Sequence, residues 1–418
     1  MLISLQNNQK QLNNFGLYLL VITTLIGSMV YIGFASLYHF VILGLLTLIL
    51  CLGINTADFK TDIMKFLLIW LAEAIISTLW APDKMLALQY VYYIFLINGI
   101  CTLFHCFLRR ENLLTFSHFM VVVLLVCNLI AFWEIYTGKH LLKDYLSTSD
   151  RLRLFKYVPA GFFMNPNDFA TFIIQILPFS FAGISSPKRL FRILSSLNTI
   201  VAFFIICATQ SRTQIILILL MYVFFAIIIR KKELIKLSAF VVAASILLYF
   251  IYPEFNRLID RALDSVSGNS LAAVVALEGG SAHIRINLLK NAGHMLLDTF
   301  GFGIGAGCHR VVMAEYSSLY FNVGRITVMH NLLGEIFVDY GILAGVLFLA
   351  AIINSCRRLY RIYKKAEEDH IRVLAIMLFF SLSMFVVCGI SSSSILQLSS
   401  VWMTFCFTSA FVKIYKKS

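Results

Sequence analysis

Apolar runs of membrane-spanning length dominate the chain and alternate with polar turns. A transmembrane helix needs about 20 consecutive, mainly apolar residues. The pattern predicts twelve such helices, at 15–34, 38–54, 63–80, 88–108, 113–133, 167–185, 191–208, 213–229, 234–252, 331–353, 371–390 and 394–412. We therefore expect an all-α polytopic membrane protein in which residues 1–418 form a single transmembrane domain.

Only two of the predicted connections are long enough to build a site outside the bilayer. They are 134–166 and 253–330, and the second contains an amphipathic helical stretch. Their side of the membrane follows from the distribution of charge. The chain has 34 Lys and Arg residues, and most of those outside the two long loops lie in every second connection. The positive-inside rule assigns these connections to the cytoplasm. Both termini are then predicted to be cytoplasmic and both long loops extracytoplasmic.

The composition agrees with this architecture and excludes several classes of function. The chain is 60% hydrophobic and only 13% charged, whereas a soluble domain carries about 25% charged residues. The net charge of +13 needs no nucleic acid, because cytoplasmic loops account for it. No GxxxxGK[ST], HExxH, DxD or paired CxxC pattern is present, so we expect no nucleotide, metal or other cofactor. The nine cysteines lie mostly in apolar spans and suggest no disulfide framework.

An arginine on an apolar helix face is the most informative residue in the loop 253–330. The stretch SAHIRINLLKNAGHMLLD at 281–298 has a helical period. Its predicted polar face holds Asn287, Lys290, Asn291, His294 and Asp298, and its apolar face holds Leu288, Leu289, Ala292, Met295 and Leu296. Arg285 falls in the middle of the apolar face, where it must meet an anion or a carbonyl group at an interface. A snorkelling arginine or a structural ion pair is the alternative.

A second arginine stands at the mouth of a span. Arg212 is the cation of the short outward turn Thr209–Thr213. Arginine at a span end is commonly an interfacial anchor, but the short outward turns of this chain are nearly free of cations. Anchoring and anion binding both remain open for Arg212.

His330 and Asn331 end the largest loop and open the span that follows it. The positive end of a helix dipole disfavours imidazolium, so His330 could act as a neutral base; a capping or interfacial role is the alternative. Glu335 and Asp339 are one turn apart and share a face of that span. Carboxylates at that depth are costly, so we expect them to face the bundle and to pair with Arg or His, mainly in a structural role.

The remaining polar motifs carry weaker signals. Arg151 and Arg153 form a small basic cluster with Lys156 in the loop 134–166, either as a solvated face or in support of an acidic ligand. Asp168 of the Asn-Pro-Asn-Asp turn suits a helix N-cap. The glycines of GFGIGAG at 301–307 indicate a tight turn or close backbone approach rather than a nucleotide loop. His283, His294 and His309 are outward histidines without a motif.

Four stretches in this order resemble the O-antigen ligase and Wzy-type polymerase superfamily of bacterial envelope enzymes. They are GFFMNPNDFA (161–170), TQSRT (209–213), HIRINLLKNAGHMLLDTFGFGIGAG (283–307) and HNLLGEIFVDYGILAG (330–345). The resemblance covers roughly residues 150–350 and rests on the order, spacing and common outward placement of these motifs. It implies a GT-C-like helical fold and an inverting glycosyltransferase of the bacterial cytoplasmic (inner) membrane. The implied donor is an undecaprenyl-diphosphate-linked glycan.

The resemblance also implies roles for individual residues and partners. Arg212 and Arg285 match the positions of the diphosphate-binding arginines, and His330 matches the catalytic histidine; Asn331, Glu335, Asp339, Arg151 and Arg153 are candidate supporting residues. The implied partners are the lipid bilayer, the donor, an acceptor glycan, and a flippase and a chain-length regulator as neighbours. The motifs favour a polymerase of repeat units, of O-antigen, capsule or teichuronic acid type. A ligase that transfers the glycan to lipid A-core, and a transporter of lipid-linked sugars, are the alternatives.

Overall fold

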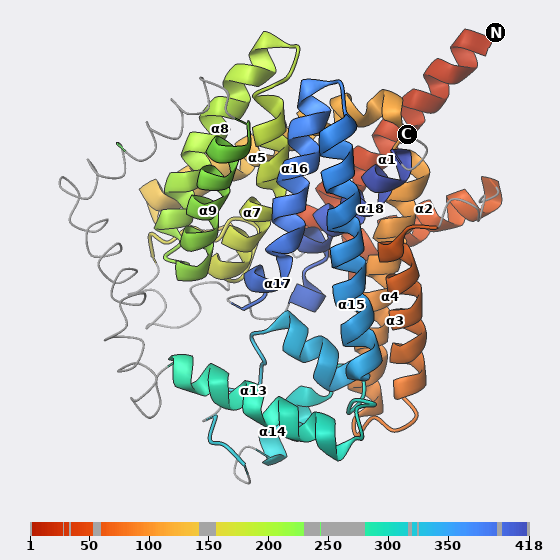
Figure 1. Ribbon diagram of the computed structural model, residues 1–418, viewed down its shortest axis with the longest axis vertical. Helices are drawn as coiled ribbons and strands as arrows, with labels where there is room; N and C mark the ends of the chain where they lie inside the picture. The colour runs from red at the N-terminus through yellow and green to blue at the C-terminus, as the bar shows by residue number, and fades with distance from the viewer. Residues whose placement is uncertain are drawn as a thin grey trace.

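A computed structural model gives the fold of the chain. It describes residues 2–27, 29–32, 35–52, 60–141, 156–229, 243, 281–316, 320–323, 326–390 and 395–415. Within these ranges the protein is helical apart from one short antiparallel hairpin, β1 (Tyr31–Ile32) with β2 (Ala35–Ser36). The fold is therefore an all-α bundle, as the sequence predicts (Figure 1).

The helices follow the predicted order. They are α1 (Leu2–Ile26), α2 (Leu37–Leu52), α3 (Asp62–Ser77), α4 (Lys84–Phe107), η2 (Arg110–Asn112), α5 (Leu113–Thr137), α7 (Pro166–Gly183), α8 (Arg189–Ala208), α9 (Arg212–Ile229), α13 (Ser281–Asp298), α14 (His309–Tyr316), α15 (Leu332–Lys365), α16 (Asp369–Ser383), α17 (Phe385–Cys388), η4 (Ile395–Gln397) and α18 (Ser399–Ile414). Each predicted span overlaps a helix except 234–252, of which only residue 243 is among the described residues.

Not every helix is long enough to cross a bilayer by itself. Within the described residues, four helical stretches have the required length and apolarity: Lys84–Phe107, Arg110–Thr137, Arg189–Ala208 and Leu332–Lys365. Leu37–Cys51 and Arg212–Ile228 are apolar but shorter. The structure thus supports a membrane protein built from helices and leaves the predicted number of spans as a prediction.

Two helices form the centre of the bundle, since they are buried on every side. All residues of α7 from Asp168 to Gly183 are buried, and so are those of α18 from Ser399 to Val412. A helix that is apolar all round belongs in a protein interior. Aromatic rings fill the space between these helices and their neighbours, with Phe407 of α18 stacked on Phe116 at 5.3 Å between centroids and packed on Phe179 at 4.8 Å.

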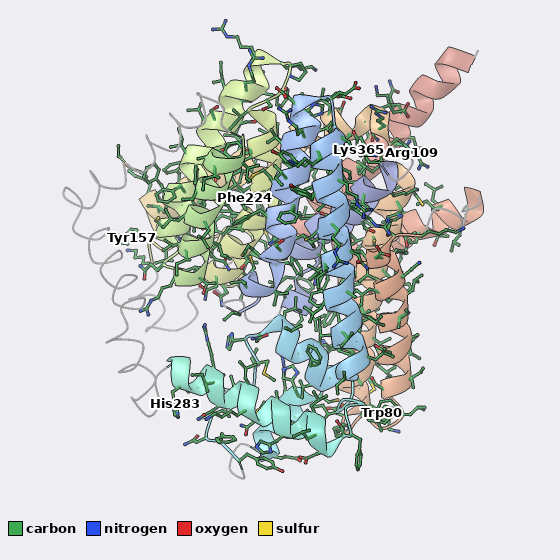
Figure 2. All side chains as sticks on the ribbon, in the orientation of Figure 1. Trp80, Arg109, Tyr157, Phe224, His283 and Lys365 are labelled. Carbon is green, nitrogen blue, oxygen red and sulfur yellow. The ribbon has the colours of Figure 1, made fainter. Side chains whose placement is uncertain are left out.

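The two ends of the bundle differ: basic residues mark one end, and a helix lies across the other. In Figure 1, α1 begins and α18 ends at the upper end, whereas α13 lies across the lower end, crosswise to the other helices. Arg109 and Lys365 mark the upper end in Figure 2, and Trp80 and His283 mark the lower end. The described part of the loop predicted to be extracytoplasmic, which contains α13 and α14, therefore lies at the end opposite to the predicted cytoplasmic connections that Arg109 and Lys365 mark.

Two predicted boundaries were wrong. The first span was expected to reach residue 34, but α1 ends at Ile26 and the chain enters the hairpin of β1 and β2. The span 331–353 continues as α15 to Lys365, because the charged residues that follow its apolar part are good helix formers. The apolar pattern thus located the predicted span 331–353 but did not locate the end of α15.

The most consequential departure is a break within α15 at Gly341, whose backbone has φ 90° and ψ 178°. The break detaches the amide of Ile342 from the carbonyl of Val338, its ordinary helical acceptor. The loop before α14 replaces the lost bonds: Ile304 N–H donates to Val338 O at 2.9 Å and Ile342 N–H donates to Gly301 O at 2.9 Å. Buried backbone groups must be paired inside a membrane protein, so the glycine loop and the break stabilise each other.

Candidate functional site at the loop-covered end

Arg212 occupies the first turn of α9 after an unusual backbone conformation. Gln210 has φ 58°, one of the few positive values at a non-glycine residue among the described residues. Such a conformation costs energy in L-residues and is concentrated at functional sites. Arg212 itself is exposed at the helix N-terminus, where the dipole disfavours a cation. The arginine therefore does not stabilise α9 through the helix dipole, and anchoring and anion binding both remain open for it.

Residue Gln214, one turn into α9, attaches this helix to α7 and α17. Its side-chain amide donates to Thr171 Oγ1 at 2.8 Å and to the carbonyl of Cys388 at 3.4 Å. The start of α7 is itself fixed by Asn165, whose side chain caps the helix by accepting from Asn167 N–H at 2.8 Å. The motifs 161–170 and 209–213 thus begin adjacent helices that are bonded to each other.

The N-cap of α7 differs from the prediction. Asp168 was expected to cap the helix, but Asn165 does so and Pro166 takes the first helical position, which a proline favours. Asp168 lies within the first turn and is buried. A further residue, which sequence reasoning missed, holds the chain just before this motif: the buried carboxylate of Glu134 accepts the N–H groups of Ala160 and Gly161, both at 2.8 Å.

Arg285 lies on α13 in a half-buried position. None of the ion pairs among the described residues involves it, and burial lowers its pKa. An arginine that is desolvated without a carboxylate partner is suited to a ligand anion. The structural ion pair considered for Arg285 is therefore absent from the part of the chain that the structure describes.

The predicted polar face of α13 was wrong in one respect. Asn287 and Asn291 are buried, not solvated. Asn287 donates to the carbonyl of Asn322 at 2.8 Å; Asn291 donates to the carbonyl of Phe321 at 3.0 Å and accepts from its N–H at 3.1 Å. The asparagines bind a returning loop segment, a contact that a helical period cannot reveal.

The first turn of α15 meets α13 one turn after Arg285. Leu289 is four residues beyond Arg285 and hence on the same helix face. A Cβ on Gly334 would lie 3.2 Å from Leu289 Cδ2 and 3.2 Å from Met329 Cγ. A larger residue at this position would require the Leu289 and Met329 side chains to move by a few tenths of an ångström. The face of α13 that carries Arg285 therefore packs beside the segment that contains His330.

His330 precedes α15 with φ 49°, a second strained non-glycine position in a candidate motif. The helix cap is Asn331, whose side chain accepts from Gly334 N–H at 2.9 Å. Asn331 therefore has the structural role, and His330 is set outside the helix. The next residue, Leu332, touches the residue that follows α17, since a Cβ on Gly389 would lie 2.8 Å from Leu332 Cβ.

These contacts connect the three candidate residues through a short chain of neighbours. Arg212 lies two residues from Gln214, which bonds Cys388. Gly389, next to Cys388, touches Leu332, two residues from His330. The same segment touches α13 through Leu289. The starts of α9 and α15 are thus linked through Cys388 and Gly389, and α13 meets the start of α15 at Leu289, at the end of the bundle that α13 covers (Figure 1).

Glu335 and Asp339 are buried, with exposures of 1% and 0%, and they face the bundle as expected. Asp339 pairs with a histidine, as the sequence predicts for one of these carboxylates. The partner is His309. Its ring Nδ1 lies 2.8 Å from Asp339 Oδ2, and its backbone N–H donates to Asp339 Oδ1 at 2.9 Å. Burial alone would lower the pKa of His309, but the charge and hydrogen bond of Asp339 raise it above its ordinary value. The pair fixes α14 to α15.

The glycine loop 301–307 is a docking element, in agreement with the tight-turn interpretation. Gly303 has φ 83°, and a Cβ there would lie 2.6 Å from Gly341 N. The Trp80 indole N–H donates to the carbonyl of Gly303 at 2.9 Å, and Ala306 N–H donates to Ser77 Oγ at 3.1 Å. The loop therefore joins the α3–α4 turn to the break in α15.

The other candidates are distributed as follows. Arg151 and Arg153 lie outside the described residues, so their supporting role stays a prediction. Among the residues that the structure does describe, no three His, Cys, Asp or Glu side chains are gathered as a metal site would require. The candidate residues Arg212, Arg285 and His330 are two cations and one histidine, side chains of a kind that can bind phosphate groups.

Comparisons with known proteins bear on the family that the chain resembles. Residues 197–349 match a family model described as O-antigen ligase. The resemblance to the O-antigen ligase and Wzy-type superfamily is thereby confirmed. A similar curated protein is the teichuronic acid biosynthesis protein TuaE of Bacillus subtilis (strain 168), 25% identical over 372 residues, covering 85% of this chain and 72% of that protein. The matched family region includes Arg212, Arg285 and His330.

Proposed function

We propose that this protein is a polymerase that joins undecaprenyl-diphosphate-linked oligosaccharide repeat units into a surface polysaccharide at the outer face of the bacterial cytoplasmic membrane. The observation that carries the proposal is the convergence of α9, α13 and α15 at one end of the bundle. The starts of α9 and α15 are linked through Cys388 and Gly389, and α13 packs on the start of α15, which supports a shared site for Arg212, Arg285 and His330, each in a motif of the superfamily. The name of the TuaE relative supports a polysaccharide product.

The arginines would bind the leaving group. In glycosyl transfer from a lipid diphosphate, the bond between the anomeric carbon and the phosphate oxygen breaks, and negative charge develops on that oxygen. Arg212 and Arg285 can each present a planar fork of N–H donors to phosphate oxygens. The half-buried setting of Arg285 strengthens such an interaction, because solvent screens it less.

His330 would act on the acceptor. The attacking hydroxyl must lose its proton as its oxygen bonds to the anomeric carbon from the face opposite the diphosphate. A neutral imidazole takes up that proton. Attack on the opposite face inverts the anomeric configuration. Asn331 would then support this histidine indirectly by capping α15, and Asp339 by fixing α15 to His309; Glu335 is a buried carboxylate on the same face of the helix.

Ligase activity is the alternative within the same superfamily, since the matching family model is described as O-antigen ligase. A ligase would use the same donor and diphosphate site but transfer the glycan to a different acceptor, such as lipid A-core. The transporter alternative belongs to another class and would need no histidine base. The arrangement of two arginines and a histidine at one end favours chemistry over transport.

The test uses purified full-length protein in detergent with undecaprenyl-diphosphate-linked repeat units, and electrophoresis of the glycan product. We expect a ladder of longer glycans, lost in His330→Ala and in Arg285→Ala. Matched controls are His294→Ala and Lys290→Ala, a histidine and a cation of the same loop helix, which should retain the ladder.

The outcomes separate the alternatives. Transfer to an added lipid acceptor without a ladder would identify a ligase. Movement of the lipid-linked sugar across a vesicle membrane without either product would identify a transporter. A ladder of unchanged yield in both alanine variants would refute the assignment of the site.

A further inference from the structure

Arg310 has no carboxylate partner among the described residues, although part of its guanidinium group is buried. It is the second residue of α14 (His309–Tyr316) and is half-buried. None of the ion pairs in the described part of the chain involves it, and its buried Nε has no hydrogen-bond partner there. A buried N–H group without an acceptor is costly, so this position suits an acceptor from a ligand.

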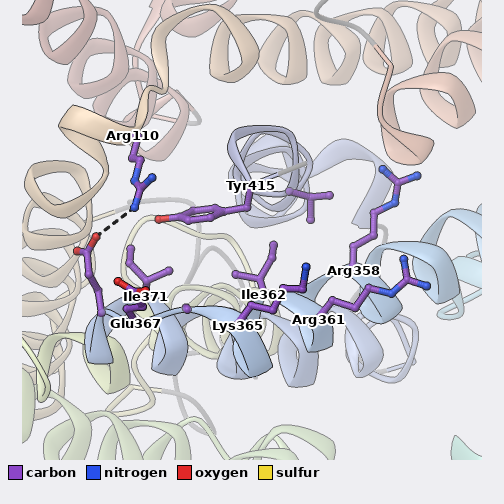
Figure 3. A pocket seen from close by; sticks show the side chains of 11 residues that line it. Arg110, Arg358, Arg361, Ile362, Lys365, Glu367, Ile371 and Tyr415 are labelled. Carbon is purple, nitrogen blue, oxygen red and sulfur yellow. Dashed lines mark ion pairs between the residues drawn. The ribbon is translucent and has the colours of Figure 1, made fainter. Parts of the chain in front are cut away.

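The arginines at the opposite end of the bundle show the contrast. A cavity of about 600 Å³ opens there between the ends of α15 and α18 (Figure 3). Three arginines of this end, Arg110, Arg358 and Arg372, lie 3.6, 2.8 and 2.7 Å from carboxylate oxygens. Arg310 lacks such a contact among the described residues, so the two ends treat their arginines differently.

The carboxylate of Asp339 lies close to the start of α14 but is bound by another residue. The ring Nδ1 of His309 lies 2.8 Å from Asp339 Oδ2, and the His309 backbone N–H donates to Oδ1 at 2.9 Å. These bonds fix the first turn of α14 and with it the backbone of Arg310. The dipole of α14 disfavours a cation at this helix start. An external anion is therefore the partner that suits Arg310.

Tyr90 of α4 forms a rigid wall beside Arg310. The guanidinium carbon lies 5.9 Å from the centroid of the Tyr90 ring. A Cβ on Gly307 would overlap this ring, and the Tyr90 hydroxyl accepts from Gln397 Nε2 at 3.3 Å. The glycine loop and η4 thus hold the ring from two directions. A fixed ring under a guanidinium keeps it in place, which lowers the entropy lost when a ligand binds.

Arg310 is separated from the proposed base along α15. This helix begins at Leu332, directly after His330 and Asn331. Asp339, which anchors α14, follows Asn331 by eight residues, and a rise of 1.5 Å per residue makes this distance roughly 12 Å. The separation suits an oligosaccharide that reaches from an anion site at Arg310 to a hydroxyl at His330.

The two sides of the bundle give the direction of approach. In Figure 1, α9, which begins with Arg212, and α4, which carries Tyr90, lie on opposite sides of the bundle with α17 between them. Inverting transfer requires the acceptor hydroxyl to attack from the face opposite the leaving diphosphate. An anion site on the α4 side is therefore placed for the acceptor and not for the leaving group.

We propose that Arg310, held by Tyr90, binds an anionic group of the acceptor, either its lipid diphosphate or an acidic sugar of the repeat unit. The inference rests on the proposed function and adds a second anion site, apart from that of Arg212 and Arg285. The guanidinium presents N–H donors to phosphate or carboxylate oxygens. Because this contact is remote from the reacting hydroxyl, it sets the affinity for the acceptor and leaves the chemical step unchanged.

The experiment follows single transfers by the purified full-length protein in detergent. The donor is a radiolabelled undecaprenyl-diphosphate-linked repeat unit whose acceptor hydroxyl is methylated, so that each labelled product reports one addition to an unlabelled acceptor repeat. Arg310→Gln should raise the KM for the acceptor about tenfold, the effect of one hydrogen bond to a charged group. The KM for the donor and kcat should keep their wild-type values.

The start of α4 provides a matched control. Lys84→Gln removes an exposed cation from the helix that carries Tyr90, and it should change the KM for the acceptor less than twofold. Should Arg310→Gln not fold, Arg310→Lys keeps the charge but loses the planar fork. This variant should raise the KM for the acceptor about threefold.

A second acceptor distinguishes the two sources of the anion. A neutral alkyl glycoside of the same repeat unit carries the sugars without the diphosphate. Equal KM values of wild type and Arg310→Gln for this acceptor would identify the diphosphate as the group that Arg310 binds. A tenfold difference that persists would identify an acidic sugar.

Two kinetic outcomes would overturn the proposal: a KM for the acceptor that Arg310→Gln leaves unchanged, and equal increases in the KM values for donor and acceptor. The absence of labelled product in the wild type would instead refute the polymerase. Native mass spectrometry then tests the subsite alone, since the wild type should bind two lipid-linked repeat units and Arg310→Gln one. Equal numbers in the two proteins would overturn the subsite.

Discussion

Replacing Gly341 by alanine tests whether the break in α15 is required by the fold. At φ 90° and ψ 178° the residue occupies a backbone region that is essentially restricted to glycine, at a cost of roughly 1–3 kcal/mol for other residues. A Cβ there would also lie 2.5 Å from Gly301 O and 2.8 Å from Phe302 O. Both neighbours are backbone atoms, so no side-chain rotation relieves the contact.

The magnitude follows from the strain and from the hydrogen bonds around the break. Three of them join the glycine loop to α15, from Ile304 N–H, Gly305 N–H and Ile342 N–H. Each contributes about 0.5–1.5 kcal/mol. Backbone strain near its lower value and partial loss of these bonds together give a destabilisation of about 3 kcal/mol, a factor of about 150 in the ratio of folded to unfolded protein.

The assay is reversible unfolding in mixed micelles, in which the mole fraction of SDS is raised and tryptophan fluorescence is recorded. Gly341→Ala should unfold at a clearly lower SDS fraction. Gly44→Ala is the matched control, because a Cβ on this helical glycine meets nothing within 4 Å and alanine favours a helix by about 1 kcal/mol. The reasoning fails if Gly341→Ala unfolds at the wild-type SDS fraction.

Three further predictions use the same protein. The pKa of His309 is raised in the folded state, so its contribution to stability is full below about pH 6.5 and is lost as the pH rises through the folded-state pKa. His309→Gln should therefore flatten the dependence of the unfolding free energy on pH. An unchanged pH dependence would refute the role of the pair with Asp339. Arg285→Lys keeps the charge without the planar fork, so the apparent donor affinity should fall about tenfold, and about a hundredfold in Arg285→Ala; identical KM values for the three proteins would contradict diphosphate binding. Asn291→Leu removes both bonds to the Phe321 backbone and should speed hydrogen exchange at residues 320–323, whereas unaltered exchange would mean that the asparagine does not hold this loop.

Much of the fold could be predicted because a bilayer imposes a simple rule on sequence. Apolar length located the apolar helices that lie along the bundle, since each spanning segment must satisfy its own backbone. The helix α13 was expected from its helical period, and α14 was not predicted. The rule says nothing about where a helix continues in water, and so it missed the extension of α15 to Lys365. Nor could it locate the break at Gly341, which depends on a loop about forty residues earlier in the chain.

The candidate site, too, could be predicted only in part from the sequence. Arg212, Arg285 and His330 could be selected from sequence because a cation on an apolar face or a polar residue at a span mouth conflicts with its surroundings. Contacts between distant segments were beyond such reasoning. His309 carries no local sign of its pairing with Asp339, thirty residues away.

The glycine loop also has a consequence for engineering. Residues 299–307 connect the end of α13 to α14 while pairing with α15 in a fixed register, at Val338, Asp339 and Ile342. Adding or deleting a single residue would shift every pairing downstream and leave carbonyls of the broken helix without donors. Although this segment reads as a flexible surface loop, it is a spacer of defined length. Tags and fusion partners therefore belong elsewhere in the chain.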